Sequence, residues 1–165
     1  MTNASAIPSL VAALADALPS RGWMMATAES CTGGLIAGAC TDLAGSSVWF
    51  ERGFVTYSNA AKTELLGVDA ALIASHGAVS EVVARAMAFG AVRYSQAQVS
   101  VAVTGVAGPG GGTPDKPVGL VWFGFSVDGV LISEKQHFPG DRAAVRSATV
   151  AHALRRLHEL MGPGA

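Results

Sequence analysis

Ser30 lies in a short polar stretch, Thr27–Gly34, between two apolar runs of different character. The run before it, 23–26, is typical of a strand, and the run that begins at Leu35 is typical of a helix. A strand-to-helix turn places backbone N–H groups and hydroxyls at a helix N-terminus, where they can meet an anion or a developing oxyanion. We therefore hypothesise that Ser30 is the nucleophile of a small hydrolase. The local sequence alone favours a plainer role, in which Ser30 caps the helix.

Lys62 is the candidate base for Ser30, because a serine hydroxyl must lose its proton to attack a carbonyl carbon. It can act only if burial or a neighbouring cation depresses its pKa, whereas most lysines are simply exposed on a helix. Tyr57 could relay a proton or hold the lysine by hydrogen bonding, and it could equally be an ordinary strand aromatic. Cys31 is a rival nucleophile, although a cysteine beside a helix start is usually small buried filler. Glu29 could orient the site or merely satisfy backbone donors in the turn.

The histidines suggest neither a better base nor a metal site. They are scattered through the chain, and none has metal-ligand spacing with another histidine, a cysteine or a carboxylate. We therefore expect no zinc and no other metal at His76, His137, His152 or His158.

The stretch Thr104–Thr113 is glycine-rich enough for its backbone amides to line a phosphate. It fits neither the P-loop pattern G-x-x-x-x-G-K-[ST] nor the dinucleotide fingerprint G-x-G-x-x-G. A flexible surface loop is the plainer interpretation, but Thr104 directly follows an apolar, strand-like run that fixes one end of the loop. Arg142, near a predicted helix start, could pair with a phosphate or a carboxylate, or it could remain a solvated surface side chain.

The remaining sequence predicts the elements that would hold these polar segments together. Helices and strands are expected in the order α-β-α-β-α-α-α-β-β-β-α, with the first helix over 8–18 and a helix cap at Ser58-Asn59. A hairpin at Asp128-Gly129 is expected to lead into a strand over 130–132. This order indicates an α/β fold, a single-domain three-layer α/β/α sandwich with a mixed sheet. Ligands of open α/β sheets bind beyond the carboxyl ends of the strands, so the segments 27–34, 57–62 and 104–113 can converge on one site.

Composition indicates a single domain over residues 1–165, with its core at about 7–160. Half of the residues are hydrophobic and 14% are charged, which argues against disorder. A net charge of −1 and a pI near 6.4 give no basic footprint for nucleic acid. No signal peptide and no membrane span are expected. Cys31 and Cys40 are interpreted as reduced thiols of a cytoplasmic protein.

Several motifs follow one another along the chain. They are Ala28-Glu29-Ser30-Cys31-Thr32-Gly33-Gly34, Tyr57-Ser58-Asn59 with Lys62, His76-Gly77-Ala78-Val79-Ser80, Thr104-Gly105-Val106-Ala107-Gly108-Pro109-Gly110-Gly111, Lys116-Pro117-Val118-Gly119 and Gly140-Asp141-Arg142. In this order they resemble the CinA C-terminal domain family, over roughly residues 7–160. The resemblance implies hydrolysis of the carboxamide of nicotinamide mononucleotide to nicotinic acid mononucleotide and ammonia, in pyridine-nucleotide recycling. It also implies a serine mechanism that needs no metal and no cofactor.

The resemblance further implies a role for each matched residue. Ser30 would be the nucleophile, with Lys62 and Tyr57 as its activating partners. Arg142 would contact the substrate. The strand-to-helix turn agrees with these roles, since the N–H groups of its helix start, Thr32-Gly33-Gly34, would stabilise the oxyanion. The implied substrate-binding set is Glu29, Thr32, Gly33, Gly34, Thr104, Gly105, Gly108, Gly110 and Arg142.

Two other functions stay open at this point. The chain could be a non-catalytic nucleotide-binding module of the same fold, or a cysteine hydrolase that uses Cys31. The expected partners are a small-molecule nucleotide substrate and a second copy of the chain, with neither nucleic acid nor a membrane. A homodimer is the family-like expectation, and Trp49 and Phe50, near a predicted turn, are expected to be exposed on a partner surface.

Overall fold

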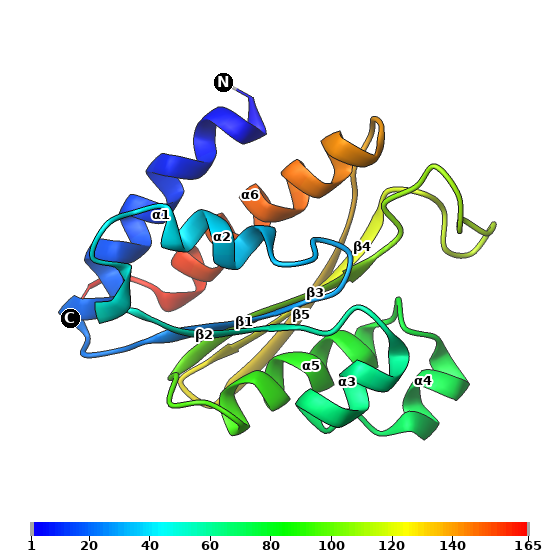
Figure 1. Cartoon of the computed structure of the whole chain (residues 1–165), viewed down its shortest axis with the longest axis horizontal. Helices are drawn as coiled ribbons and strands as arrows, with labels where there is room; N and C mark the ends of the chain where they lie inside the picture. The colour runs from blue at the N-terminus through cyan, green and yellow to red at the C-terminus, as the bar shows by residue number, and fades with distance from the viewer. Residues whose placement is uncertain (1, 165) are drawn as a thin grey trace.

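A five-stranded mixed sheet forms the middle layer of the computed structural model, which describes residues 2–164 (Figure 1). β1 pairs in parallel with both β2 and β3, whereas the β3–β4 and β4–β5 pairs are antiparallel. The strands lie in the order β2-β1-β3-β4-β5 and span Met25–Glu29 (β1), Phe50–Val55 (β2), Val99–Gly105 (β3), Leu120–Val127 (β4) and Val130–His137 (β5). The predicted mixed sheet is confirmed.

Helices cover both faces of this sheet (Figure 1). One face carries α1 (Asn3–Ser20), α2 (Leu35–Thr41) and α6 (Arg142–Met161). The other face carries α3 (Asn59–Leu66), α4 (Ala70–His76) and α5 (Glu81–Arg93), and a short 3-10 turn, η1 (Ser46–Val48), leads into β2. Each face buries its own apolar cluster, one around Leu14, Phe123 and Leu154 and the other around Leu66 and Met87. The three layers follow from these two cores.

Side-chain caps begin several of the helices at the places where the sequence predicts helix starts. The Ser58 hydroxyl accepts the Ala61 N–H at 3.0 Å, and the Asp141 carboxylate accepts the Ala144 N–H at 2.9 Å. Such caps satisfy donors that would otherwise lack an intrahelical partner. The cap at Ser58 matters for the site, because it starts α3 one turn before Lys62.

Two predicted elements are shorter than the observed ones. α1 begins at Asn3 instead of Pro8, because the Thr2 hydroxyl accepts the Ser5 N–H at 3.1 Å and caps the helix earlier. β5 was expected to end at Ile132 but continues to His137, since it pairs with β4 over its whole length. Pairing with a neighbouring strand therefore extends an element beyond its apolar stretch.

The expected exposure of Trp49 is wrong. Its side chain is only 2% exposed and packs edge-on against Phe50, with ring centroids 6.4 Å apart, and Phe50 itself is half-buried. The Trp49 carbonyl accepts the Met25 N–H at 2.8 Å, which connects the end of η1 to the start of β1. Trp49 belongs to the core, so it offers no partner surface. The homodimer stays a prediction.

Candidate active site

Three parallel strands end at the same edge of the sheet and bring the predicted polar segments together. β1 lies between β2 and β3, and all three run in one direction. Just past the strand ends, the Ser30 N–H donates to the Val103 carbonyl at 3.1 Å, and the Thr56 N–H donates to the Glu29 carbonyl at 2.9 Å. These bonds continue the ladder by one residue on each side of β1. Ser30 is therefore fixed at the centre of the edge where open α/β sheets bind ligands.

Lys62 reaches across from α3 to Ser30. Its Nζ lies 3.0 Å from the Ser30 Oγ, and it donates to the carbonyls of Thr56 at 3.1 Å and Tyr57 at 3.3 Å. The lysine side chain is 1% exposed and the serine is 9% exposed. Nucleophile and base are thus within hydrogen-bonding reach of each other and largely shielded from water.

The surroundings of Lys62 favour its neutral amine. No carboxylate lies within 4.0 Å of its Nζ in the part of the chain that the structure describes. Burial lowers the pKa of Lys62 from its ordinary value of 10.5, because the ammonium loses hydration without gaining a counter-ion. A lysine with a depressed pKa loses its proton more readily, and the neutral amine can accept a proton from a serine hydroxyl.

Cys31 has the opposite character. Its thiol is buried, and burial raises its pKa to about 11. A thiol with such a pKa stays protonated at neutral pH and is a poor nucleophile. The geometry therefore favours Ser30 over Cys31.

Tyr57 meets Lys62 through its backbone carbonyl. Its phenol is turned to the surface, with the side chain 61% exposed, and its hydroxyl accepts a long 3.4 Å contact from Arg142. The same guanidinium donates to the Gly108 carbonyl at 2.7 Å. Arg142 therefore joins the segment after β2 to the glycine-rich loop after β3, at the mouth of the site.

A cavity of about 200 Å³ surrounds these groups. Three of the predicted substrate-binding residues line it, namely Thr104, Gly105 and Arg142. The Thr104 hydroxyl donates to the Ala78 carbonyl at 2.9 Å. Four further lining residues were not predicted, although all of them lie inside the motifs at 57–62, 76–80 and 104–111; they are Asn59, Ala78, Val79 and Ala107. The whole lining is Ser30, Cys31, Tyr57, Asn59, Lys62, Ala78, Val79, Thr104, Gly105, Ala107 and Arg142.

The other predicted substrate-binding residues do not line this cavity; they are Glu29, Thr32, Gly33, Gly34, Gly108 and Gly110. Glu29 is fully buried, and its carboxylate accepts the Thr32 hydroxyl at 2.5 Å and the N–H groups of Ile36 at 2.8 Å and Ala37 at 3.0 Å. The Gly33 N–H donates to the Ser30 carbonyl at 3.1 Å. Part of the predicted oxyanion site, at the start of α2, is therefore engaged within the chain itself.

A family model described as the CinA C-terminal domain matches residues 8–161. The chain belongs to the CinA C-terminal domain family. Within it, the nicotinamide-nucleotide amidohydrolase PncC of Enterobacter agglomerans is 56% identical over 140 residues, which cover 84% of this chain and 85% of that protein. PncC of Pseudomonas putida is 51% identical over 154 residues, covering 93% of this chain and 96% of the relative. A CinA-like protein of Mycolicibacterium gilvum is 58% identical over 139 residues, but these make up 33% of its length.

Solved structures of the CinA superfamily share this fold closely. The competence/damage inducible protein CihA of Agrobacterium tumefaciens superposes with a TM-score of 0.89 at 47% identity, covering 93% of this chain and 94% of that chain. A CinA superfamily protein of Escherichia coli superposes with a TM-score of 0.91 at 38% identity, covering 93% of this chain and 90% of its own. The predicted resemblance and fold class are both confirmed.

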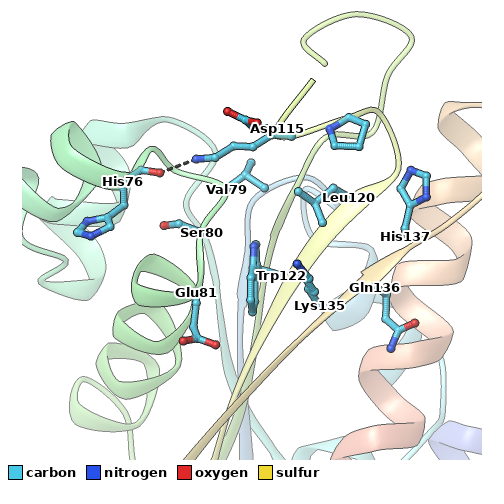
Figure 2. A pocket seen from close by; sticks show the side chains of 12 residues that line it. His76, Val79, Ser80, Glu81, Asp115, Leu120, Trp122, Lys135, Gln136 and His137 are labelled. Atoms are coloured by element: carbon cyan, nitrogen blue, oxygen red, sulfur yellow. Dashed lines mark hydrogen bonds between the residues drawn. The ribbon is translucent and has the colours of Figure 1, made fainter. Parts of the chain in front are cut away.

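In this CinA-family chain a second, larger cavity of about 620 Å³ lies on the outer side of the segment after α4 (Figure 2). His76, Ser80 and Glu81 face Trp122 and Lys135 of β4 and β5 across it, and Lys116 donates to the His76 carbonyl. Val79 lines both cavities, so only a thin wall of chain separates them.

Within residues 2–164, no cluster of three or more histidine, cysteine, aspartate or glutamate side chains is arranged to hold a metal ion. No helix in this described part is long and apolar enough to cross a membrane.

Proposed function

We propose that this chain hydrolyses the carboxamide of nicotinamide mononucleotide to nicotinic acid mononucleotide and ammonia, in pyridine-nucleotide recycling, with Ser30 as the nucleophile. The observation that carries the proposal is the 3.0 Å contact between the Ser30 hydroxyl and the buried Lys62 amine. Relatives that are 51–56% identical to the chain are named nicotinamide-nucleotide amidohydrolases, which supports the reaction and the substrate. The chain is an amidohydrolase of this family.

The two carbonyls around Lys62 explain how the amine is aimed. In the neutral amine, two N–H bonds donate to the carbonyls of Thr56 and Tyr57. The remaining tetrahedral position holds the lone pair, and it faces the Ser30 hydroxyl. Tyr57 thus acts on the lysine through its main chain, while its phenol lies beside Arg142.

The reaction runs in two halves with Lys62 as the proton carrier. Ser30 Oγ bonds to the amide carbon while its proton moves to Lys62, and the resulting ammonium then gives that proton to the departing ammonia as the C–N bond breaks. Water attacks the acyl-enzyme, Lys62 takes a proton from the water, and the proton returns to Ser30 Oγ as the ester bond breaks. One amide and one water give one carboxylic acid and one ammonia.

The oxyanion is assigned to N–H groups that donate to no other residue in the described part of the chain. In the described part of the chain, the Cys31 and Thr32 N–H groups donate no hydrogen bond to another residue, and Cys31 lines the cavity. These N–H groups directly follow the nucleophile in sequence, where other strand-to-helix serine hydrolases find one of their donors. Removing one such donor typically costs about 100- to 1000-fold in rate.

The mouth of the site fits the rest of the nucleotide. A cavity of about 460 Å³ adjoins the Ser30 cavity, and the two share Ala107 and Arg142. We assign the nicotinamide ring to the inner cavity and the phosphoribosyl group to the outer one. The Arg142 guanidinium can pair with the phosphate there, exchanging its contacts with Gly108 and Tyr57 for a charged partner.

Ammonia release from nicotinamide mononucleotide tests this function. Wild type is expected to release ammonia with no added metal, and Ser30→Ala is expected to bind the nucleotide without turnover. Nicotinamide riboside, which lacks the phosphate, is expected to show a higher KM with wild type. In Arg142→Gln the KM values for nicotinamide mononucleotide and nicotinamide riboside should be closer to each other, since the phosphate then has no guanidinium to pair with.

The alternative, a non-catalytic nucleotide-binding module, makes a different prediction for the same preparations. Under it, wild type binds nicotinamide mononucleotide as well as Ser30→Ala does and releases no ammonia. That result would remove the hydrolase from consideration.

A further inference from the structure

Arg146 lies on α6, behind the turn that carries Ser30. Its Nε donates to the Cys31 carbonyl at 3.1 Å, and its Nη2 donates to the Thr32 carbonyl at 3.2 Å. Among residues 2–164, no carboxylate lies within 4.0 Å of this guanidinium. A planar guanidinium can donate along two parallel directions at once, so it holds two consecutive peptide groups in one orientation.

Glu29 holds the same turn through other groups. Its fully buried carboxylate accepts the Thr32 hydroxyl and the first free N–H groups of α2, from Ile36 and Ala37. No cation lies within 4.0 Å of it in the described chain. Thr32 therefore donates its hydroxyl to the Glu29 carboxylate and accepts a hydrogen bond from the Arg146 guanidinium at its carbonyl. Glu29 and Arg146 do not form an ion pair with each other.

We propose that Arg146 and Glu29 are positioning residues for the reaction at Ser30, fixing the turn between them so that its free N–H groups meet the oxyanion. The proposal rests on the function proposed above. In a trans peptide the carbonyl and the N–H point in opposite directions, and the Cys31–Thr32 bond is trans. Because Arg146 binds the Cys31 carbonyl, it turns the Thr32 N–H away from α6. The charge of the guanidinium also polarises that peptide and strengthens its N–H as a donor.

The packing around Arg146 supports a role beyond filling space. The guanidinium approaches the turn at Gly33, where an added Cβ would lie 3.6 Å from Nη2 and where φ is +58°. Arg146 also lines an open cavity of about 560 Å³ between α1, α2 and α6. If the side chain is removed, a small cation from solution can therefore enter and reach the two carbonyls.

Chemical rescue of Arg146→Ala tests the proposal, with Arg155→Ala as the matched control. Arg155 lies on the same helix, is half-buried, and makes no hydrogen bond through its side chain within the described residues. We expect Arg146→Ala to lower kcat for nicotinamide mononucleotide by about 10- to 100-fold, the cost of a small misplacement at a reacting centre, with little change in KM. Millimolar guanidinium chloride should restore part of kcat saturably, and sodium chloride at equal ionic strength should not. Arg155→Ala should behave as wild type in both salts.

Two further variants separate positioning from loss of folding. Arg146→Lys keeps the charge but not the planar fork, so its kcat should fall between those of wild type and Arg146→Ala. Glu29→Gln keeps the size of the side chain but turns an NH₂ toward backbone donors, and it should also lower kcat at unchanged KM. The rate at which an organophosphonate modifies Ser30 gives a second readout that needs no nucleotide, and both variants should slow it.

Different results would overturn the positioning role of Arg146 and the amidohydrolase function on which it rests. A kcat of Arg146→Ala within about twofold of wild type would overturn the inference, and so would a loss that guanidinium does not rescue. Absence of ammonia release by wild type would instead overturn the proposed function. In that case, equal organophosphonate rates in wild type and Arg146→Ala would overturn the positioning role as well, and slower modification of Arg146→Ala would support it.

Discussion

Lys62→Met separates what the lysine does for catalysis from what it costs the fold. Methionine is similar in length and uncharged, so it can occupy the same buried space beneath Ser30. Turnover is expected to fall by about 1000-fold or more, as when one member of a serine catalytic unit is removed, because no other group takes the proton from Ser30. The thermodynamic consequence is more specific, and it follows from burial.

Burial lowers the pKa of Lys62 below the 10.5 of an ordinary lysine. Between these two values the unfolded chain binds more protons than the folded one, so the free energy of unfolding rises with pH, by up to about 1.4 kcal/mol per pH unit. Below the folded pKa both states carry the proton and the cost of burying it is complete. Above 10.5 both states have lost it and the cost is gone. The difference in stability between wild type and Lys62→Met should therefore shift in favour of wild type as the pH rises through this window.

Urea unfolding of the two proteins from neutral to alkaline pH measures this shift. Methionine leaves the carbonyls of Thr56 and Tyr57 without their lysine donor, at a cost of about 1–3 kcal/mol each. That cost changes the difference in free energy of unfolding between wild type and Lys62→Met by the same amount at every pH. The slope of this difference with pH is therefore unchanged. In parallel, kcat/KM of wild type should rise with pH through the same lowered pKa. Stability curves that stay parallel at all pH values would refute the depressed pKa and, with it, the neutral lysine as the base.

Four other substitutions test three separate features. Cys31→Ser should keep the activity, and the native Cys31 thiol should resist alkylation until the protein is denatured, because burial holds its pKa at about 11. Gly90→Ala should cost about 1–3 kcal/mol, read from the melting temperature, since the new Cβ would lie 2.1 Å from the Leu66 carbonyl oxygen. Gly38→Ala, also within a helix but with no atom within 4 Å of the new Cβ, should instead be neutral or stabilising by up to about 1 kcal/mol. Thr104→Val loses a 2.9 Å bond to the segment after α4 that lines the cavity, so KM should rise while kcat changes little, as steady-state kinetics would show.

The order of the helices and strands was predictable because it depends on local signals. Apolar periodicity and caps such as Ser58 lie within a few residues of the elements they define. Apart from the start of α1, which the local cap at Thr2 decides, the errors arise where distant contacts decide. β5 continues to His137 because β4 lies beside it, and Trp49 is buried because neighbouring strands and helices cover it, which no short window of sequence records.

The Ser30–Lys62 contact was predictable only from the combination of motifs with the rule for strand ends. The residues lie 32 positions apart, and either alone suits a cap or a surface lysine. At Tyr57 the prediction was based on the phenol, as a group that could relay a proton or hold the lysine. In the structure it is the backbone carbonyl of Tyr57 that contacts Lys62. For Arg146 one weak signal exists, since it falls four residues after Arg142 on a predicted helix and so shares a face with it.

Glu29 shows why a strand-to-helix turn does not by itself make an oxyanion site. The free N–H groups at the start of α2 were the reason to expect one, yet this carboxylate already binds those of Ile36 and Ala37. An anion built into the chain offsets the positive end of the helix and weakens its attraction for a developing negative charge. The oxyanion must then rely on N–H groups earlier in the turn, whose direction depends on how the turn is held. The oxyanion would then be stabilised by the Cys31–Thr32 peptide, and Arg146, which binds the carbonyl of that peptide, becomes the group that sets its orientation.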